Sequence, residues 1–209
     1  MLSRHPQRRL RPRLRLRRRA RRAGRGGGGR LHGRGRKRGG RGVREIEPVQ
    51  VAKRRRDAAL AHLARSVPYV RHLGVEFDRR GDELTARLPF DEKLIGNPRI
   101  PALHGGAIGA FLEITALMEL AWALTWERME GGGAGAAEIE AGRFPPWPKT
   151  IDFTIDYMRS GLPRDVYARA RVARMGRRYA SVHVEGWQDN RGRPIAQATG
   201  HFLMPEGAA

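Results

Sequence analysis

Two adjacent glycines at the start of an apolar segment, and a carboxylate eight residues further on, are the residues of this chain best suited to chemistry. Gly105 and Gly106 open the segment, and Glu113 lies inside it. Glycine in the first turn of a helix costs roughly 0.5–1 kcal/mol relative to alanine. Burying a carboxylate among apolar residues costs more free energy, unless a partner or a reaction makes use of its charge. Both features therefore indicate function.

The glycine pair predicts a site for a carbonyl group. The first amides of a helix have no partner within the helix, and no Ser, Thr, Asp or Asn precedes Gly105 to cap them. An acyl carbonyl would have room to approach, and the amides and the helix dipole would stabilise an oxyanion. The alternative is that Gly105 and Gly106 only allow a loop to pack tightly against the helix.

The carboxylate predicts a general base or a nucleophile. No Lys or Arg lies three or four residues from Glu113 on either side, so a salt bridge along the helix does not explain it. Glu119 has equally apolar neighbours, and spacing alone does not separate the two. Glu113 lies roughly 12 Å along the helix from Gly105, at about 1.5 Å per residue. If both act on one substrate, the carboxylate comes from a second subunit, which predicts a dimer with two symmetric sites.

The elements that must position these residues follow from the hydrophobic pattern. Residues 104–126 predict a helix that is apolar on all sides and therefore buried. An amphipathic helix is expected at 45–66, and residues 89–101 and 131–148 are expected to be loops, because glycine and proline recur in them. Alternation predicts strands at residues 72–78, 83–88, 150–158, 166–174, 178–188 and 195–204.

This order of elements predicts an α+β fold in which one helix lies on a curved antiparallel sheet. In the strand at 150–158, alternation places Ile151, Phe153, Ile155 and Tyr157 on one side. Residues 45–209 are expected to form a single domain.

The composition separates a basic tail from this domain. Residues 1–44 hold 19 of the 42 basic residues and none of the 21 acidic ones, so 45–209 carry 23 basic and 21 acidic residues. We expect the Arg/Gly-rich tail to be disordered. The tail can be interpreted as an arm that binds nucleic acid, as a transit peptide or as a segment without function. It has no aromatic residue for base stacking, so nucleic acid is not an expected partner except through this tail.

Several classes of site and location are not expected. The chain has no cysteine, and its seven histidines lack the spacing of metal ligands, so no metal site is predicted. Glu113 and Glu119 interrupt the longest apolar run, so no membrane span is expected. We therefore predict a cytoplasmic protein.

The motifs resemble a known family. His104-Gly105-Gly106, followed by Leu112-Glu113, is similar to the signature of hotdog-fold acyl-CoA thioesterases of the PaaI-like, phenylacetate-pathway type. The resemblance covers about residues 66–204. It includes the approach at 94–97, the strand at 150–158, the turn at 174–178 and the closing strand from Pro194. It implies a hotdog fold, in which the sheet wraps a long central helix.

The resemblance also implies roles for individual residues. Glu113 falls at the catalytic carboxylate, where many members have Asp, and Gly106 at the amide that polarises the thioester carbonyl. Gly105 lies beside it at the helix mouth. Asn97 corresponds to a loop residue that orients water or substrate, although it precedes His104 by seven residues and not six. Thr150 matches a position that often carries a hydroxyl near the site.

The remaining implied roles concern substrate and assembly. His104 is expected to brace the loop beside the substrate, whereas related dehydratases use it as a base. Arg177 and Arg178 are candidates for binding coenzyme A phosphates, the alternative being ordinary solvated turn arginines. The implied reaction hydrolyses an acyl-CoA without a bound cofactor, in a homodimer or homotetramer. The alternatives are an acyl-thioester hydratase or dehydratase, and a non-catalytic acyl-CoA-binding module.

Overall fold

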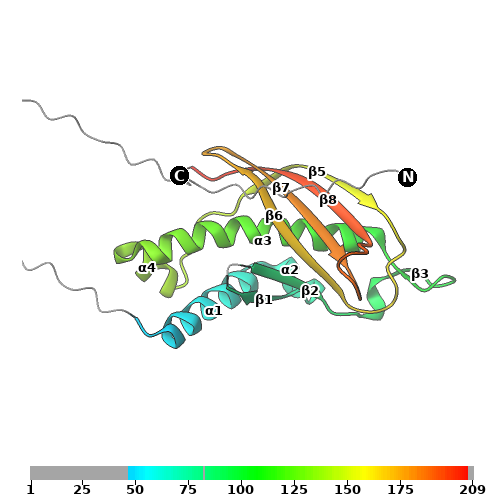
Figure 1. Cartoon of the computed structure of the whole chain (residues 1–209), viewed down its shortest axis with the longest axis horizontal. Helices are drawn as coiled ribbons and strands as arrows, with labels where there is room; N and C mark the ends of the chain where they lie inside the picture. Colours follow the sequence, from blue (N-terminus) through cyan, green and yellow to red (C-terminus); the bar gives the residue numbers. More distant parts are fainter. Residues whose placement is uncertain (1–46, 82, 207–209) are drawn as a thin grey trace, which may run out of the picture. The chain divides into compact units, whose positions relative to one another are not determined.

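The computed structural model describes residues 47–81 and 83–206. The tail predicted at 1–44 lies outside the described residues. Within the described part, an antiparallel sheet of six strands has the order β1-β2-β6-β7-β8-β5 (Figure 1). Its strands are β1 (Glu76–Arg80), β2 (Glu83–Leu88), β5 (Lys149–Tyr157), β6 (Val166–Met175), β7 (Tyr179–Trp187) and β8 (Ala196–Leu203). The four later strands agree with the predicted ranges to within about two residues at each end.

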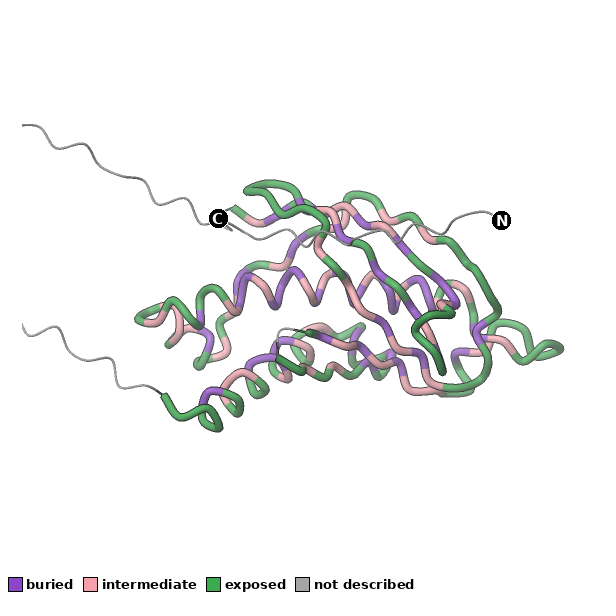
Figure 2. The backbone as a smooth tube through the Cα atoms, in the orientation of Figure 1, coloured by how far each residue is buried: buried purple, intermediate pink, exposed green. Residues whose placement is uncertain are grey.

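The sheet curves around one long helix, α3 (Gly105–Gly131) (Figure 1). Burial runs along most of this helix, as Figure 2 shows. Phe111, Leu112 and Leu120 of α3 pack in one cluster with inward residues of the sheet such as Val182 and Phe202. The predicted buried helix and the α+β hotdog fold are confirmed.

Among the described helices, α3 alone is long and apolar enough to cross a membrane by length and composition. Of its most apolar window, 67% is buried inside the domain. The segment is the core helix of the fold.

A second cluster fills the space between α1 (Val49–Ser66), α4 (Gly133–Glu140) and the C-terminal half of α3. Leu63 of α1, Trp122 of α3 and Ile139 of α4 are among its buried members. Helix α1 was predicted, whereas α4 lies in a segment predicted to be a loop. That prediction was wrong because burial of Ile139 stabilises a glycine-rich helix whose own propensity is low.

Short elements approach the N-terminus of α3. Helix α2 (Pro68–Leu73) occupies part of the range predicted as a strand from residue 72, which begins only at Glu76. Proline at the first helical position favours this helix. The predicted loop at 89–101 contains η1 (Glu92–Leu94) and β3 (Ile95–Asn97), and β3 pairs with β4 (Ala102–Leu103).

Candidate active site

The N-terminus of α3 is capped by its own histidine. The Gly106 amide donates a hydrogen bond to His104 Nδ1 over 2.9 Å. His104 thus caps the helix, and the Gly106 amide that the sequence predicts to be open already has an acceptor. The Gly105 amide has no acceptor among the described residues. The open donor at this helix mouth is therefore Gly105.

Close packing also explains the glycines around the cap. A Cβ on Gly106 would lie 3.0 Å from His104 Nδ1, and one on Gly105 would lie 3.3 Å from the ring of Tyr157. At Gly96 a Cβ would approach the His104 Cα to 2.7 Å. The tight-packing interpretation therefore applies to the pair, and it coexists with an open amide at Gly105.

Glu113 and Thr150 are brought together. The Thr150 hydroxyl donates to Glu113 Oε1 over 2.7 Å, and both side chains are partly buried. This bond fixes one carboxylate oxygen and leaves the other, Oε2, without a partner among the described residues. An oriented carboxylate with one free oxygen is suited to accept a proton or to attack a carbonyl.

A β-bulge in β5 makes this contact possible. The pairing of β5 with β8 shifts register between Thr150 and Asp152, so Ile151 is the extra residue. Simple alternation would place Ile151 with Phe153 facing α3. Instead Ile151 is 60% exposed and Thr150 faces the helix. The predicted face of Ile151 was wrong because the bulge reverses the alternation at this end of β5.

Glu119 differs from Glu113 in its surroundings. Burial raises the pKa of Glu119 from its ordinary value of 4.5 to about 7. No hydrogen bond or ion pair to this carboxyl occurs within residues 47–81 and 83–206. It has the pKa of a base near neutral pH but no group that orients it.

Asn97 lies in the hairpin of β3 and β4, which projects beyond the sheet (Figure 1). Its Oδ1 accepts hydrogen bonds from the amides of Arg99 and Ile100, at 3.0 and 3.4 Å. Gly96 forms a bulge in this hairpin, one residue before Asn97. Within residues 47–81 and 83–206, no hydrogen bond joins Asn97 to Glu113 or His104.

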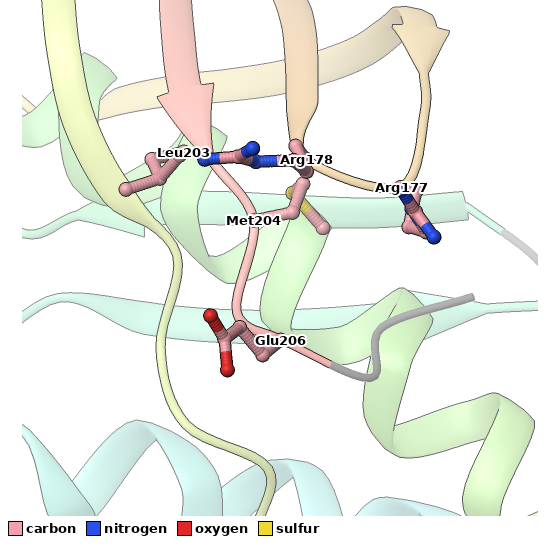
Figure 3. A pocket seen from close by; sticks show the side chains of 5 residues that line it. All are labelled: Arg177, Arg178, Leu203, Met204 and Glu206. Atoms are coloured by element: carbon pink, nitrogen blue, oxygen red, sulfur yellow. The ribbon is translucent and has the colours of Figure 1, made fainter.

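Arg177 and Arg178 lie on the turn between β6 and β7, beside a cavity of about 400 Å³. In Figure 3 the Arg178 side chain reaches towards Leu203, and Arg177 lies apart from it on the turn. Leu203 pairs with Lys149, the neighbour of Thr150, and with Tyr179. The turn is thus two strands, or about 10 Å, from the strand that carries Thr150, at the same end of the sheet.

The predicted site residues therefore form separate groups in one chain. At the N-terminal end of α3 the structure brings together His104, Gly105 and Gly106 with Tyr157, for which no site role was predicted. Glu113 and Thr150 lie two turns further along the helix. In the described part of the chain no group of three or more His, Cys, Asp or Glu residues is placed to hold a metal ion.

Comparison with known proteins agrees with the fold described above. Residues 101–195 match the thioesterase superfamily model. The medium/long-chain acyl-CoA thioesterase YigI of Salmonella typhimurium is 28% identical over 140 residues, which cover 66% of this chain and 86% of that protein.

Solved structures share the fold. A crystal structure of a protein from Chromobacterium violaceum is 32% identical, has a TM-score of 0.51, and the alignment covers 75% of this chain and 96% of that one. The PaaI protein of the Escherichia coli phenylacetic acid degradation operon has a TM-score of 0.55 at 12% identity, over 74% of this chain and 96% of that one, and shows likeness of fold alone. The sequence motifs, the helix wrapped by its sheet and these relatives together show that the chain belongs to the thioesterase superfamily and has the hotdog fold.

Proposed function

We propose that this protein hydrolyses acyl-CoA thioesters to the free acid and coenzyme A. The observation that carries the proposal is the Glu113 carboxylate, which Thr150 orients on the same helix whose mouth has an open amide at Gly105. The acyl-CoA substrate class is supported by the name of the relative YigI.

In the proposed reaction, the thioester carbonyl accepts a hydrogen bond from the Gly105 amide. Glu113 either takes a proton from the attacking water or attacks the carbonyl itself, forming an anhydride that water then hydrolyses. In both routes the C–S bond breaks, the sulfur leaves as the coenzyme A thiolate, and the thiolate gains a proton. The amide and the helix dipole stabilise the negative charge that develops on the carbonyl oxygen.

The proposed site is shared between two copies of the chain. Gly105 and Glu113 of one copy are roughly 12 Å apart along α3, too far to act on one carbonyl carbon. Strand β5 ends the sheet and pairs only with β8 within the described residues, and Ile151 and Met158 beside this edge are more than half exposed. Such an edge favours pairing with another chain. We propose a homodimer as the smallest active unit, and the homotetramer remains a prediction.

The other candidate residues have supporting roles in this proposal. Arg177 and Arg178 are exposed, form no ion pair with any described residue, and lie at the end of the sheet that carries Thr150. We assign them to the coenzyme A phosphates, held by the subunit that supplies the carboxylate. Asn97 contacts substrate or water through its amide nitrogen, since its oxygen closes the turn at residues 98–100.

The hydratase alternative requires His104 as the catalytic base. His104 Nδ1 accepts the Gly106 amide proton, so the neutral ring carries its own proton on Nε2. Neither nitrogen is then free to accept another proton while the cap is intact. This arrangement favours hydrolysis by the carboxylate over a histidine-based reaction.

The test is thiol release by the full chain from short, medium, long and aryl acyl-CoAs. Glu113→Gln and Glu119→Gln form a matched pair on one helix. We expect Glu113→Gln to lower kcat at least about 100-fold, the usual contribution of a positioned base, and Glu119→Gln to retain activity. Release that survives Glu113→Gln would remove Glu113 from the mechanism. Binding of acyl-CoA without any turnover would establish the non-catalytic module instead.

A further inference from the structure

We propose that Tyr157 is a positioning residue that sets the donor geometry at the mouth of α3. Its hydroxyl donates a hydrogen bond to the Gly105 carbonyl oxygen over 2.7 Å. Tyr157 contacts no proposed reacting atom and acts through the peptide group that links Gly105 to Gly106.

That peptide group joins the tyrosine to the histidine cap. Its carbonyl oxygen accepts from Tyr157, and its N–H, which belongs to Gly106, donates to His104 Nδ1. Successive hydrogen bonds through one peptide polarise each other, so the bond from Tyr157 strengthens the bond to His104. The three groups form a continuous chain from β5 to the cap.

Packing holds both ends of this chain in place. On the β5 side, Gly109 has no side chain, and a Cβ there would lie 2.8 Å from Ile155 Cδ1 and 3.4 Å from Tyr157 Oη. On the other side, the His104 amide donates to the Leu94 carbonyl over 2.7 Å, and Gly96 lies against the His104 ring. The strand, the helix turn and the hairpin therefore fix one arrangement.

The arrangement determines which hydrogen bonds the mouth offers. With Nδ1 occupied as an acceptor, the neutral His104 ring carries its proton on Nε2. The exposed His104 ring then presents an N–H, close to the open amide of Gly105. Without the Tyr157 bond, the Gly105–Gly106 peptide keeps its place in the helix but loses its link to β5, which weakens the cap and shifts the neighbouring Gly105 amide.

A purely structural role for the hydroxyl is separable from this one. The Tyr157 side chain is 54% exposed, so replacing its hydroxyl with hydrogen leaves the ring packed on the first turn of α3 and removes little buried area. Tyr157→Phe is therefore expected to fold. Tyr69→Phe is the matched control, because Tyr69 is 50% exposed, stacks on His72 of α2 and forms no hydrogen bond with His104 or Gly105.

The first measurement is ¹⁵N NMR of the histidine rings in the full chain, with the His104 signals identified by their loss in His104→Gln. In the wild type and in Tyr69→Phe we expect one tautomer, protonated on Nε2. In Tyr157→Phe we expect a mixture of the two tautomers. An unchanged His104 spectrum in Tyr157→Phe would overturn the proposal, whether or not the protein is a thioesterase.

The second measurement rests on the proposed function. We expect Tyr157→Phe to lower kcat about fivefold, as for the loss of about 1 kcal/mol from one neutral hydrogen bond, with KM within twofold. A loss shared by Tyr69→Phe, or a change confined to KM, would contradict a positioning role. If the wild type releases no thiol from any acyl-CoA, the proposed function fails and the NMR result alone decides the role of Tyr157.

Discussion

Replacing Glu119 with glutamine measures how much the burial of one ionised carboxylate in α3 lowers the free energy of unfolding. The side chain is partly buried and forms no hydrogen bond or ion pair with a described residue. Glutamine has nearly the same shape and cannot ionise. The substitution therefore removes the charge and leaves the packing of the helix almost unchanged.

The magnitude follows from the two pKa values. Burial raises the pKa of Glu119 from 4.5 to about 7 in the folded protein. At about 1.4 kcal/mol for each pH unit between them, the protonated carboxyl contributes up to about 3 kcal/mol to stability. This contribution is fully present below pH 4.5, decreases as the pH rises, and is lost above about pH 7. Glu119→Gln is therefore expected to be about 3 kcal/mol more stable than the wild type at pH 8 and equally stable at pH 4.

The assay is urea unfolding of the wild type and Glu119→Gln from pH 4 to pH 8, at one protein concentration because an oligomer's stability depends on it. Comparing the two at each pH cancels the titration of all other groups. A stability difference that does not change with pH, or a variant less stable than the wild type at pH 8, would refute the reasoning.

Three further results are expected. Thr150→Val removes the donor to Glu113 and should lower kcat about five- to tenfold, whereas Thr150→Ser keeps the donor and should retain kcat. Equal activity of the two variants in thiol release would exclude Thr150 as the group that orients Glu113. Arg178→Ala should raise KM for an acyl-CoA about fivefold but not for the matching acyl-pantetheine, which lacks the nucleotide phosphates; equal effects on both substrates would remove the arginine from phosphate binding. Gly200→Ala should destabilise the fold by about 1–3 kcal/mol in thermal unfolding, because its Cβ would lie 2.6 Å from a phenylalanine ring. Gly131→Ala has open space around the new Cβ and should not destabilise the fold. Similar melting temperatures of the two variants would contradict the explanation by close packing.

The hydrophobic pattern was enough to predict the central helix, the later strands and the fold class. Long periodic segments follow the burial pattern directly, so β6 to β8 lie close to their predicted ranges, and α3 begins close to its predicted start but ends five residues later, at Gly131. Helix α4 was missed because its stability depends on a tertiary contact, burial of Ile139 between α1 and α3. Local composition alone indicates a loop there.

The sequence anticipated only some of the side-chain contacts at the candidate site, for physical reasons. Glu113 and Thr150, both candidates by family resemblance, are in contact, and their roles stay predictions. The occupied amide at Gly106 was missed because histidine is not among the residues that usually cap helices, although its Nδ1 accepts a hydrogen bond. The role proposed for Tyr157 had no local signal, since it depends on how β5 crosses the first turn of α3.

The bulge at Ile151 divides β5 into two parts whose side chains alternate between the two faces of the sheet in opposite phase. Thr154 and Asp156 follow the alternation that begins at Asp152, whereas Thr150 follows the opposite one. If β5 kept Ile151 but paired with β8 without the bulge, Ile151 would face α3 and Thr150 would turn away, although neither Thr150 nor Glu113 would have been substituted. Alignments of relatives must therefore allow a one-residue gap here, or they will compare Thr150 with residues of the opposite face. The pairing register of this strand is as much a part of the proposed site as the identity of its residues.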